Sequence, residues 1–464
     1  MTAPLSSYSQ GQQVDLAIVG GGPCGLTAAL EASRKGLSVA LFEHSPTLGG
    51  MSASFRVAGQ MVDYGSHRLH PSMPTRVRRL LTQLLGPDLQ VRQRHGRLRL
   101  RGRWVDFPLR PTRAAWSLPV SFLASVTKDM ALKPLRPQHH QSYADVVTHG
   151  LGPTALTEFH GPMAEKLWGV PPTELSSTLA IKRLSVRSPT RLARSVARTA
   201  RPGGRTFLYP RLGYGQIVDQ MAKAACTNGA SLTTSVRVRN LTDGLDGCRI
   251  ELDSGLTVSA KHSFWTGSVD SLAVAMGTPS AVPRRTRAMV LVYLVVPRPQ
   301  YTKYDAHYVP DLDIVFSRLS EPLNYRDGPE PENQTVLCAE IPCDVDDYVW
   351  NASDETVESM VIDGLERLGF QVPTIIQCQT RRLPSVYPLV TINDAHISDH
   401  QSLPPFSLRH ITVLGRQGLA VADNLHHVVD MAQSAVDCLD LSGRWSTAQW
   451  DRHRDRFSRF VVED

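Results

Sequence analysis

The sequence has no apolar run long enough to cross a membrane as a helix. Its longest uninterrupted run, Ala288 to Val296, has the length of a strand, whereas a spanning helix needs about 20 apolar residues. The first residues, Met1 to Gln13, are polar and uncharged, unlike a signal peptide, which joins a basic stretch to an apolar one. We therefore expect a cytoplasmic protein without a transmembrane segment.

Cysteine patterns and nucleic-acid modules are also missing. The seven cysteines are scattered and include no CxxC pair, which favours reduced thiols over a disulfide framework. The net charge of +7 is modest for 464 residues, and the aromatic residues are not interleaved with basic ones as on a nucleic-acid surface. With 42% apolar residues, the chain is expected to be globular, with two or three domains and no nucleic-acid partner.

A glycine-rich turn near the N-terminus carries the strongest pattern. A predicted strand, Val14 to Val19, runs into Gly20, Gly22 and Gly25, and an Ala/Leu-rich helix follows. In a dinucleotide site the first glycine allows the tight turn, the second admits the pyrophosphate, and the third lets helix and strand pack closely. The helix N-terminus then faces the phosphate charge.

An acidic residue completes this pattern. A second predicted strand, Leu37 to Phe42, ends at Glu43, about 20 residues beyond the glycines, where a carboxylate accepts hydrogen bonds from a ribose diol. The order of strand, glycines, helix, strand and acid predicts a dinucleotide site. The alternative is a glycine-rich turn without a ligand.

A second glycine pair beyond the acid indicates which dinucleotide is bound. Gly49 and Gly50, followed by Met51, resemble the segment of glutathione-reductase-like flavoproteins that wraps the ribityl and pyrophosphate of FAD. Nicotinamide enzymes usually lack this pair. The resemblance therefore implies FAD as the cofactor.

The C-terminal part of the chain agrees with this cofactor. Ile411 to Arg416 is predicted to form a strand that ends in Gly415, and Asp423 to Leu439 a helix. Flavoproteins of this class close the cofactor site with such a strand, glycine and helix. We expect Gly415, Arg416 and Asn424 to contact the cofactor, with the helix dipole facing the flavin or its phosphates.

The predicted elements indicate an α/β protein with a Rossmann-type, glutathione-reductase-like FAD-binding domain, a helical insertion and a mixed-sheet substrate domain. A hairpin is predicted over His95 to Phe107 and a helix over Thr154 to Trp168. Further strands are predicted at Met289 to Val296, Asp313 to Arg318 and Thr335 to Ile341. The expected division is 1–75, 205–285 and 405–445 for the discontinuous FAD domain, 76–204 for the helical insertion, 286–404 for the substrate region, and 446–464 for a C-terminal tail.

Several segments resemble the UDP-galactopyranose mutases, especially the eukaryotic-type enzymes. The main one is Lys166 to Ser176, which contains the motif Lys-Leu-Trp-Gly-Val-Pro-Pro and is followed by Ile181 to Leu184. Asp63 to His67 and the pair Gly415-Arg416 also match. The family is related to the amine oxidase and protoporphyrinogen oxidase group.

This resemblance implies redox-neutral chemistry on a nucleotide-diphosphate sugar. In that family the N5 atom of reduced FAD attacks the anomeric carbon and displaces the nucleotide diphosphate, and the sugar recloses as a furanose or a pyranose. By position in this sequence, Arg183 matches the arginine that grips the diphosphate, and Tyr387 a tyrosine that reaches the phosphates. Trp168 lies near the same site, and His67 beside the flavin.

The sequence departs from the family at the second diphosphate arginine. The matching position falls at Val296, so either the register of the alignment is shifted or Arg298 or Arg318 takes over. Asn324 and Tyr325 are further candidates for the substrate pocket. Two acidic groups, Asp311/Asp313 and Asp344/Asp346/Asp347, offer oxygen ligands for a divalent metal, but solvated loop acids are commoner and we expect no metal site.

Three functions therefore compete at this point. The first is a flavin-dependent nucleotide-sugar mutase, an isomerase of carbohydrate biosynthesis. The second is a flavin oxidase or desaturase acting on an amine, a porphyrinogen or a polyene, because the same fold hosts both chemistries. The third is a protein that has lost flavin turnover and acts through a metal or as a binding module. The sequence does not indicate an oligomeric state.

Overall fold

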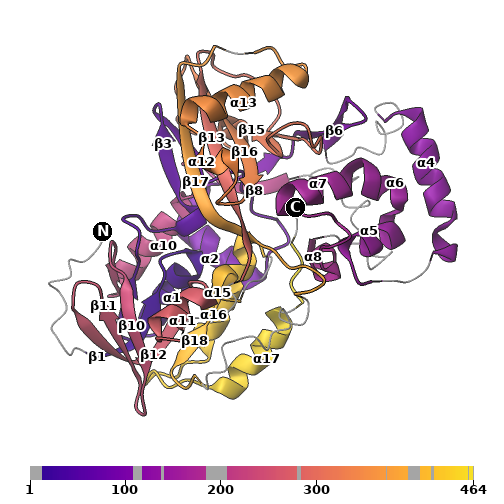
Figure 1. The fold of residues 1–464 in the computed structure, drawn as a ribbon. Coiled ribbons are helices and arrows are strands. Elements are labelled where there is room, and N and C mark those ends of the chain that lie inside the picture. The colour runs from indigo at the N-terminus through magenta and orange to yellow at the C-terminus, as the bar shows by residue number, and fades with distance from the viewer. Residues whose placement is uncertain are drawn as a thin grey trace.

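A seven-stranded sheet, assembled from distant parts of the chain, forms the lower half of the molecule (Figure 1). The computed structural model describes residues 13–107, 118–136, 140–183, 206–278, 284–372, 374–394, 408–419, 423–457 and 459–462. The strands of this first sheet are β1 (Gln13–Val19), β2 (Val39–Phe42), β9 (Ser231–Thr233), β10 (Val238–Asp243), β11 (Cys248–Leu252), β12 (Thr257–Trp265) and β18 (Ile411–Val413).

Parallel pairing places β1 in the middle of this sheet. β1 pairs in parallel with β2 and β12, and β18 pairs in parallel with the end of β12. Leu16 and Ile18 on β1 are fully buried in the core that also holds three helices, α1 (Pro23–Arg34), α10 (Gln216–Thr227) and α16 (Leu425–Asp437). The carboxyl ends of β2, β1, β12 and β18 therefore lie along one edge of the sheet, where ligands bind in open α/β sheets.

The second seven-stranded sheet is mostly antiparallel and forms the upper half of the molecule (Figure 1). Its order is β17 (Gln377–Pro388), β13 (Thr286–Val296), β16 (Thr335–Cys343), β15 (Arg318–Ser320), β14 (Ala306–Tyr308), β6 (Gly96–Leu100) and β7 (Arg103–Phe107). The helix α13 (Asp354–Arg367) packs Val357, Val361 and Leu365 against one face. The hairpin β3 (Ser54–Val57) and β4 (Gln60–Asp63) packs on the other.

A lobe of helices projects to the right in Figure 1. It contains α4 (Val120–Ala131), α5 (Tyr143–Leu151), α6 (Pro153–Ala155), the π-helix η5 (Leu156–His160), α7 (Gly161–Trp168) and α8 (Ser177–Arg183). The single helix predicted over Thr154 to Trp168 is therefore broken in three. Pro162 lacks the amide hydrogen that an uninterrupted α-helix would use, which accounts for the irregular turn before it.

The remaining elements connect and cover these parts. They are α2 (Thr75–Leu85), β5 (Leu89–Gln93), β8 (Thr206–Pro210), α11 (Val269–Ala275), α12 (Tyr348–Asn351), α15 (Gly415–Leu419) and α17 (Thr447–Phe457), with 3-10 helices η2 (Gly50–Ser52), η3 (Gly86–Asp88), η4 (Lys133–Leu135) and η7 (Pro322–Tyr325). Within the described ranges, no helix combines the length and the apolar character that a membrane span requires.

The two sheets and the helices that cover them confirm the predicted α/β class.

The predicted hairpin over His95 to Phe107 is confirmed as β6 and β7, and these strands join the second sheet. The strand predicted over Asp313 to Arg318 is wrong except for its last residue, because β15 begins at Arg318. Asp313 instead pairs with Arg367 on α13.

Candidate cofactor and substrate site

The glycine-rich turn holds the end of β1 against the start of α1. A Cβ atom added to Gly25 would lie 2.0 Å from the carbonyl oxygen of Gly20, so only glycine permits this close approach. Gly20 has a φ of +107°, in the region that L side chains rarely adopt. The turn is thus built as a dinucleotide fingerprint requires.

The glycine pairs Gly21-Gly22 and Gly49-Gly50 lie next to each other beside an open space. The amide of Gly49 donates to the carbonyl of Gly21 over 2.8 Å, and a Cβ on Gly50 would lie 3.7 Å from the Cα of Gly22. A Cβ on Gly22 would meet nothing within 4 Å. Met51 follows in η2. The N-terminus of α1 thus faces free space, which fits a pyrophosphate.

Glu43 lies at the carboxyl end of β2 and is buried. Its Oε2 accepts the amide of Gly21 at 2.6 Å, and its Oε1 accepts the amide of Ser45 at 2.8 Å. These two bonds fix the carboxylate beside the glycine turn. Each oxygen retains acceptor capacity for a ribose hydroxyl.

The C-terminal segment closes against this turn. Gly415 has a φ of +85°, and a Cβ there would lie 3.3 Å from the Cβ of Cys24 on α1. Asn424 is the N-cap of α16, and its amide donates to Nδ1 of His427 over 3.1 Å. The start of α16 therefore lies near the start of α1, although about 400 residues separate them in the chain.

Arg416 links this segment to the second sheet. Its guanidinium donates to the carbonyl of Val386 on β17 over 3.1 Å and to that of Asp423 over 3.3 Å. Its Nε is buried and has no hydrogen-bond partner among the described residues. The cofactor segment and the end of β17 thus share one arginine, and one of its donors is left for a ligand.

His67 follows Gly65 in the loop after β4. Its ring stacks on Tyr214 at 4.9 Å, and its Nδ1 is buried with no partner in the described part of the chain. Burial lowers the pKa of His67, and Arg318 and Arg416 lower it further, while Asp63 and Glu340 oppose this. His67 is therefore neutral at neutral pH, with one ring nitrogen available to a ligand.

Asp423 is a buried carboxyl group beside Arg416. Burial raises the pKa of Asp423 from 3.8 to about 7, although Arg416 and Lys182 both favour its ionised form. Its Oδ2 has no hydrogen-bond partner among the described residues. The site thus holds a carboxyl group that changes charge near neutral pH.

Three residues from the helical lobe and the second sheet meet in what we call the aromatic clamp: Trp168, Arg183 and Tyr387. The guanidinium of Arg183 lies 4.9 Å from the centre of each ring, and the two rings are 6.4 Å apart. The indole Nε1 of Trp168 donates to the carbonyl of Pro388 over 3.3 Å. No carboxylate pairs with Arg183 within the described ranges, and its Nε is buried without a partner.

Of the other arginines expected at the substrate, Arg318 lies near the site and Arg298 does not. Arg318 donates to both oxygens of Glu340 over 2.8 and 2.6 Å, so its charge is already neutralised. Arg298 follows the end of β13 and lies over Tyr301 at 5.7 Å, whereas Tyr387 pairs with Arg287 at the start of that strand. The length of β13 therefore separates Arg298 from the aromatic clamp.

Asn324 and Tyr325 both have structural partners. Asn324 donates to the carbonyls of Thr302 and Tyr304, each over 2.8 Å, and so fastens its own loop. The hydroxyl of Tyr325 donates to Ser66 over 2.9 Å. Tyr325 thus supports the residue before His67, while the hydrogen bonds of Asn324 hold its loop to residues 300–304.

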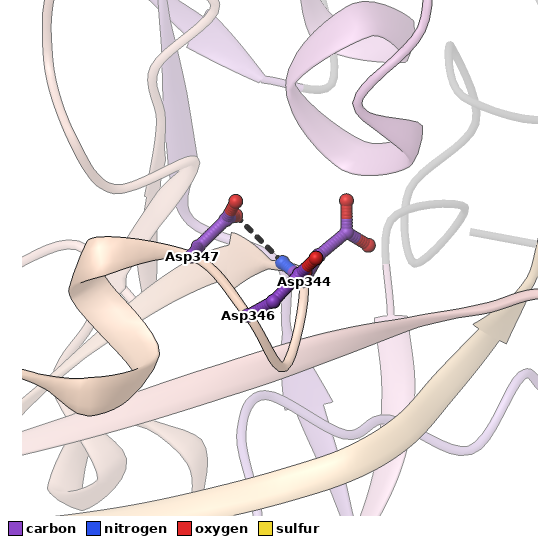
Figure 2. Close-up of side chains that lie close together, drawn as sticks. All are labelled: Asp344, Asp346 and Asp347. Atoms are coloured by element: carbon purple, nitrogen blue, oxygen red, sulfur yellow. Dashed lines mark hydrogen bonds between the residues drawn. The ribbon is translucent and has the colours of Figure 1, made fainter.

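Three of the five acids proposed as possible metal ligands pair with arginines. Asp311 accepts from Arg99 over 3.1 Å, and Asp313 pairs with Arg367. In the loop after β16, carboxylate oxygens of three acids lie within 4.8 Å of one another, and the backbone amide of the first donates to the last over 2.6 Å (Figure 2). These acids are Asp344, Asp346 and Asp347. Asp344 also forms an ion pair with Arg287.

A family model for flavin-containing amine oxidoreductases matches residues 23–392. The chain belongs to this family. Flavin-containing amine oxidoreductases carry a flavin. The open glycine turn, the buried acid, and the nitrogens of His67 and Arg416 that have no partner among the described residues fit such a group.

Solved structures show the same fold over nearly the whole chain. Reduced UDP-galactopyranose mutase is 20% identical, with 97% of this chain and 99% of that chain covered and a TM-score of 0.77. A protein of an Exiguobacterium species, assigned as a protoporphyrinogen oxidase, is 17% identical, with 93% and 99% covered and a TM-score of 0.70. This member of the family is therefore a flavoprotein with the fold of UDP-galactopyranose mutase, as the resemblance predicted.

One curated relative matches a short segment. Lycopene beta cyclase of Arabidopsis thaliana is 56% identical over 45 residues, which is 10% of this chain and 9% of that protein. So short a match says nothing of the remaining nine-tenths of either protein.

Three charged residues near the site escaped the sequence patterns. Glu340 and Asp423 are buried acids, and Arg287 directly precedes the apolar run at Ala288. For Arg287, the sequence did offer one sign of a structural role, a charged residue directly before an apolar run. For Glu340 the sequence offered no such sign, because its neighbours Arg318 and Ser66 approach it only after β15 and β16 have paired.

Proposed function

We propose that this protein is an FAD-dependent nucleotide-sugar mutase that interconverts pyranose and furanose rings. The observation that carries the proposal is the aromatic clamp, in which Arg183 lies against both Trp168 and Tyr387 without a carboxylate partner among the described residues. A partly buried guanidinium without a counter-ion favours an anionic ligand, and its planar fork suits a diphosphate.

The clamp adjoins the segment proposed to bind FAD. Arg416 lies 5.9 Å from the ring of Tyr387 on the cofactor side, so guanidinium groups approach this tyrosine from two elements. When bound, the reduced flavin supplies the nucleophile for the anomeric carbon. Arg183 and Tyr387 would hold the departing diphosphate, where negative charge develops.

The second candidate, an oxidase, draws on the family itself, whose name describes amine oxidation. The charges at the clamp argue against a cationic amine. Arg183 and Arg416 would both repel an ammonium group near Tyr387 in a site of low dielectric. A neutral polyene or an anionic porphyrinogen would meet no such repulsion, so the test below includes both as substrates of the oxidase.

The visible absorption spectrum of the purified protein is the first test. The dithionite-reduced protein is then titrated under nitrogen with UDP- and GDP-sugars. The mutase proposal expects flavin bands that respond to a nucleotide sugar and a furanose product with no net oxidation. A flavin that ignores nucleotide sugars, but is reduced by an amine, porphyrinogen or polyene and consumes dioxygen on reoxidation, would establish the oxidase instead.

Replacing Arg183 tests the clamp. We expect Arg183→Ala to weaken binding of UDP about tenfold to a hundredfold, because charge-assisted hydrogen bonds are lost, while FAD content stays normal. Arg183→Lys should fall between the two, since it keeps the charge without the fork. Arg298→Ala is the matched control, and UDP affinity is measured by calorimetry. Equal affinity of the Arg183→Ala and Arg298→Ala variants for every nucleotide tested would refute the assignment.

A further inference from the structure

An ion pair lies directly beside the aromatic clamp. Arg287 is the cross-strand partner of Tyr387 in the pairing of β13 with β17, so their side chains leave the same face of the sheet. The Arg287 side chain is only 7% exposed and pairs with Asp344, which is 41% exposed. The Nε of Arg287 is buried without a partner among the described residues.

The guanidinium of Arg287 also fills the space beneath Gly169. A Cβ atom on Gly169 would lie 2.6 Å from its Cζ, and the φ of Gly169 is +72°. Gly169 caps the C-terminal end of α7, directly after Trp168. A cation at this position interacts favourably with the partial negative charge of the last carbonyls of the helix. Arg287 therefore touches the residue that follows one ring of the clamp and lies opposite the other ring.

Asp344 is held in place by its own loop. Its amide donates to the Asp347 carboxylate over 2.6 Å (Figure 2). The amide of Asp347 donates back to the carbonyl of Asp344 over 3.1 Å. Among the described residues Asp344 is the only acid that pairs with Arg287. It supplies the counter-charge that a buried guanidinium needs.

We propose that Arg287, held by Asp344, is a positioning residue that sets the spacing of Trp168 and Tyr387 for the substrate diphosphate. This inference deepens the proposed function and rests on it. Arg287 does not contact the diphosphate in this scheme. It fixes the end of α7 against β13, and Asp344 fixes Arg287.

The test uses the flavin-loaded full chain and a matched pair of acids in one loop. Asp344→Asn removes the counter-charge of Arg287, whereas Asp346→Asn removes a neighbouring exposed carboxylate that forms no ion pair with Arg287. We expect Asp344→Asn to weaken UDP binding about three- to tenfold, and Asp346→Asn to leave it unchanged. Adding Asp344→Asn to the Arg287→Met variant should then weaken UDP binding no further, because Arg287 and Asp344 act as one unit.

Hydrogen exchange separates this inference from the proposed function. Amides of residues 161–169 should exchange faster in Asp344→Asn than in Asp346→Asn, with or without UDP. If the wild type binds no nucleotide but this difference appears, the proposed function fails, and what remains of the inference is that Arg287 and Asp344 fix the end of α7.

Two results would overturn the inference. One is equal UDP affinity and equal exchange in the two acid variants. The other is a loss of UDP binding in Arg287→Met with unchanged or tighter binding in Asp344→Asn, which would make Arg287 a direct ligand of the diphosphate.

Discussion

Arginine side chains around the site differ in how their charge is neutralised. Arg318 donates to both oxygens of Glu340, and Arg287 pairs with Asp344. Arg183 lies against two aromatic rings and has no carboxylate partner within the described ranges, and Arg416 lies 3.7 Å from Asp423. Because Asp423 loses its charge when protonated, the net positive charge of the site depends on one carboxyl group.

The pKa of Asp423, raised to about 7 by burial, makes stability depend on pH. The folded state holds this proton more tightly than the unfolded state, so the group lowers the free energy of unfolding as pH rises from about 4 to about 7. We expect Asp423→Asn to lack this decrease, and its stability relative to wild type to rise over that window by up to a few kcal/mol.

Urea unfolding at several pH values measures this effect. Asp451→Asn is the control, because Asp451 is 61% exposed on α17. Parallel stability profiles for wild type and Asp423→Asn between pH 4 and 7 would contradict the assignment.

At the scale of elements, different glycines of the turn between β1 and α1 serve folding and ligand binding. Gly25 lies in contact with the backbone of Gly20, while Gly22 faces open space. The same substitution should therefore have different consequences at positions three residues apart.

We expect Gly25→Ala to lower the free energy of unfolding by at least about 1–3 kcal/mol, because the Cβ of the alanine overlaps the backbone oxygen of Gly20. Gly22→Ala should leave stability within about 1 kcal/mol, since Gly22 has an ordinary φ of −75°, yet weaken FAD binding. Thermal unfolding and FAD titration of stripped protein distinguish the two. Normal FAD affinity in a stable Gly22→Ala variant would show that the pyrophosphate lies elsewhere.

Local patterns in the sequence predicted the elements that depend on neighbouring residues. The strand at Val14 to Val19, the hairpin over His95 to Phe107 and most of the helix over Asp423 to Leu439 are confirmed. The position expected for Arg298 was wrong because it depends on pairing between distant strands. The register of β13 decides that Arg287 faces Tyr387 and that Arg298 lies at the other end of the strand, and no local pattern encodes this register.

At the scale of the whole molecule, the proposed cofactor site joins the two ends of the chain. α1 and α16 pack in one core, so a cofactor held between them orders both segments. We expect FAD to slow hydrogen exchange in residues 20–34 and 415–437 together, and to raise the unfolding temperature of stripped protein with FAD concentration.

The helix α13 provides the control for that experiment. It packs on the face of the second sheet opposite the β3–β4 hairpin, and its exchange should not respond to FAD. Protection of residues 20–34 alone would show that the C-terminal segment does not contact the cofactor.

The aromatic clamp takes two of its three members from the helical lobe, while the glycine turn belongs to the first sheet. Under the proposed function, different segments of the chain therefore determine the choice of substrate and the retention of the flavin. An exchange of residues 140–183 with those of a relative would transplant substrate preference into an unaltered flavoprotein, provided that the position opposite Tyr387 is exchanged with it.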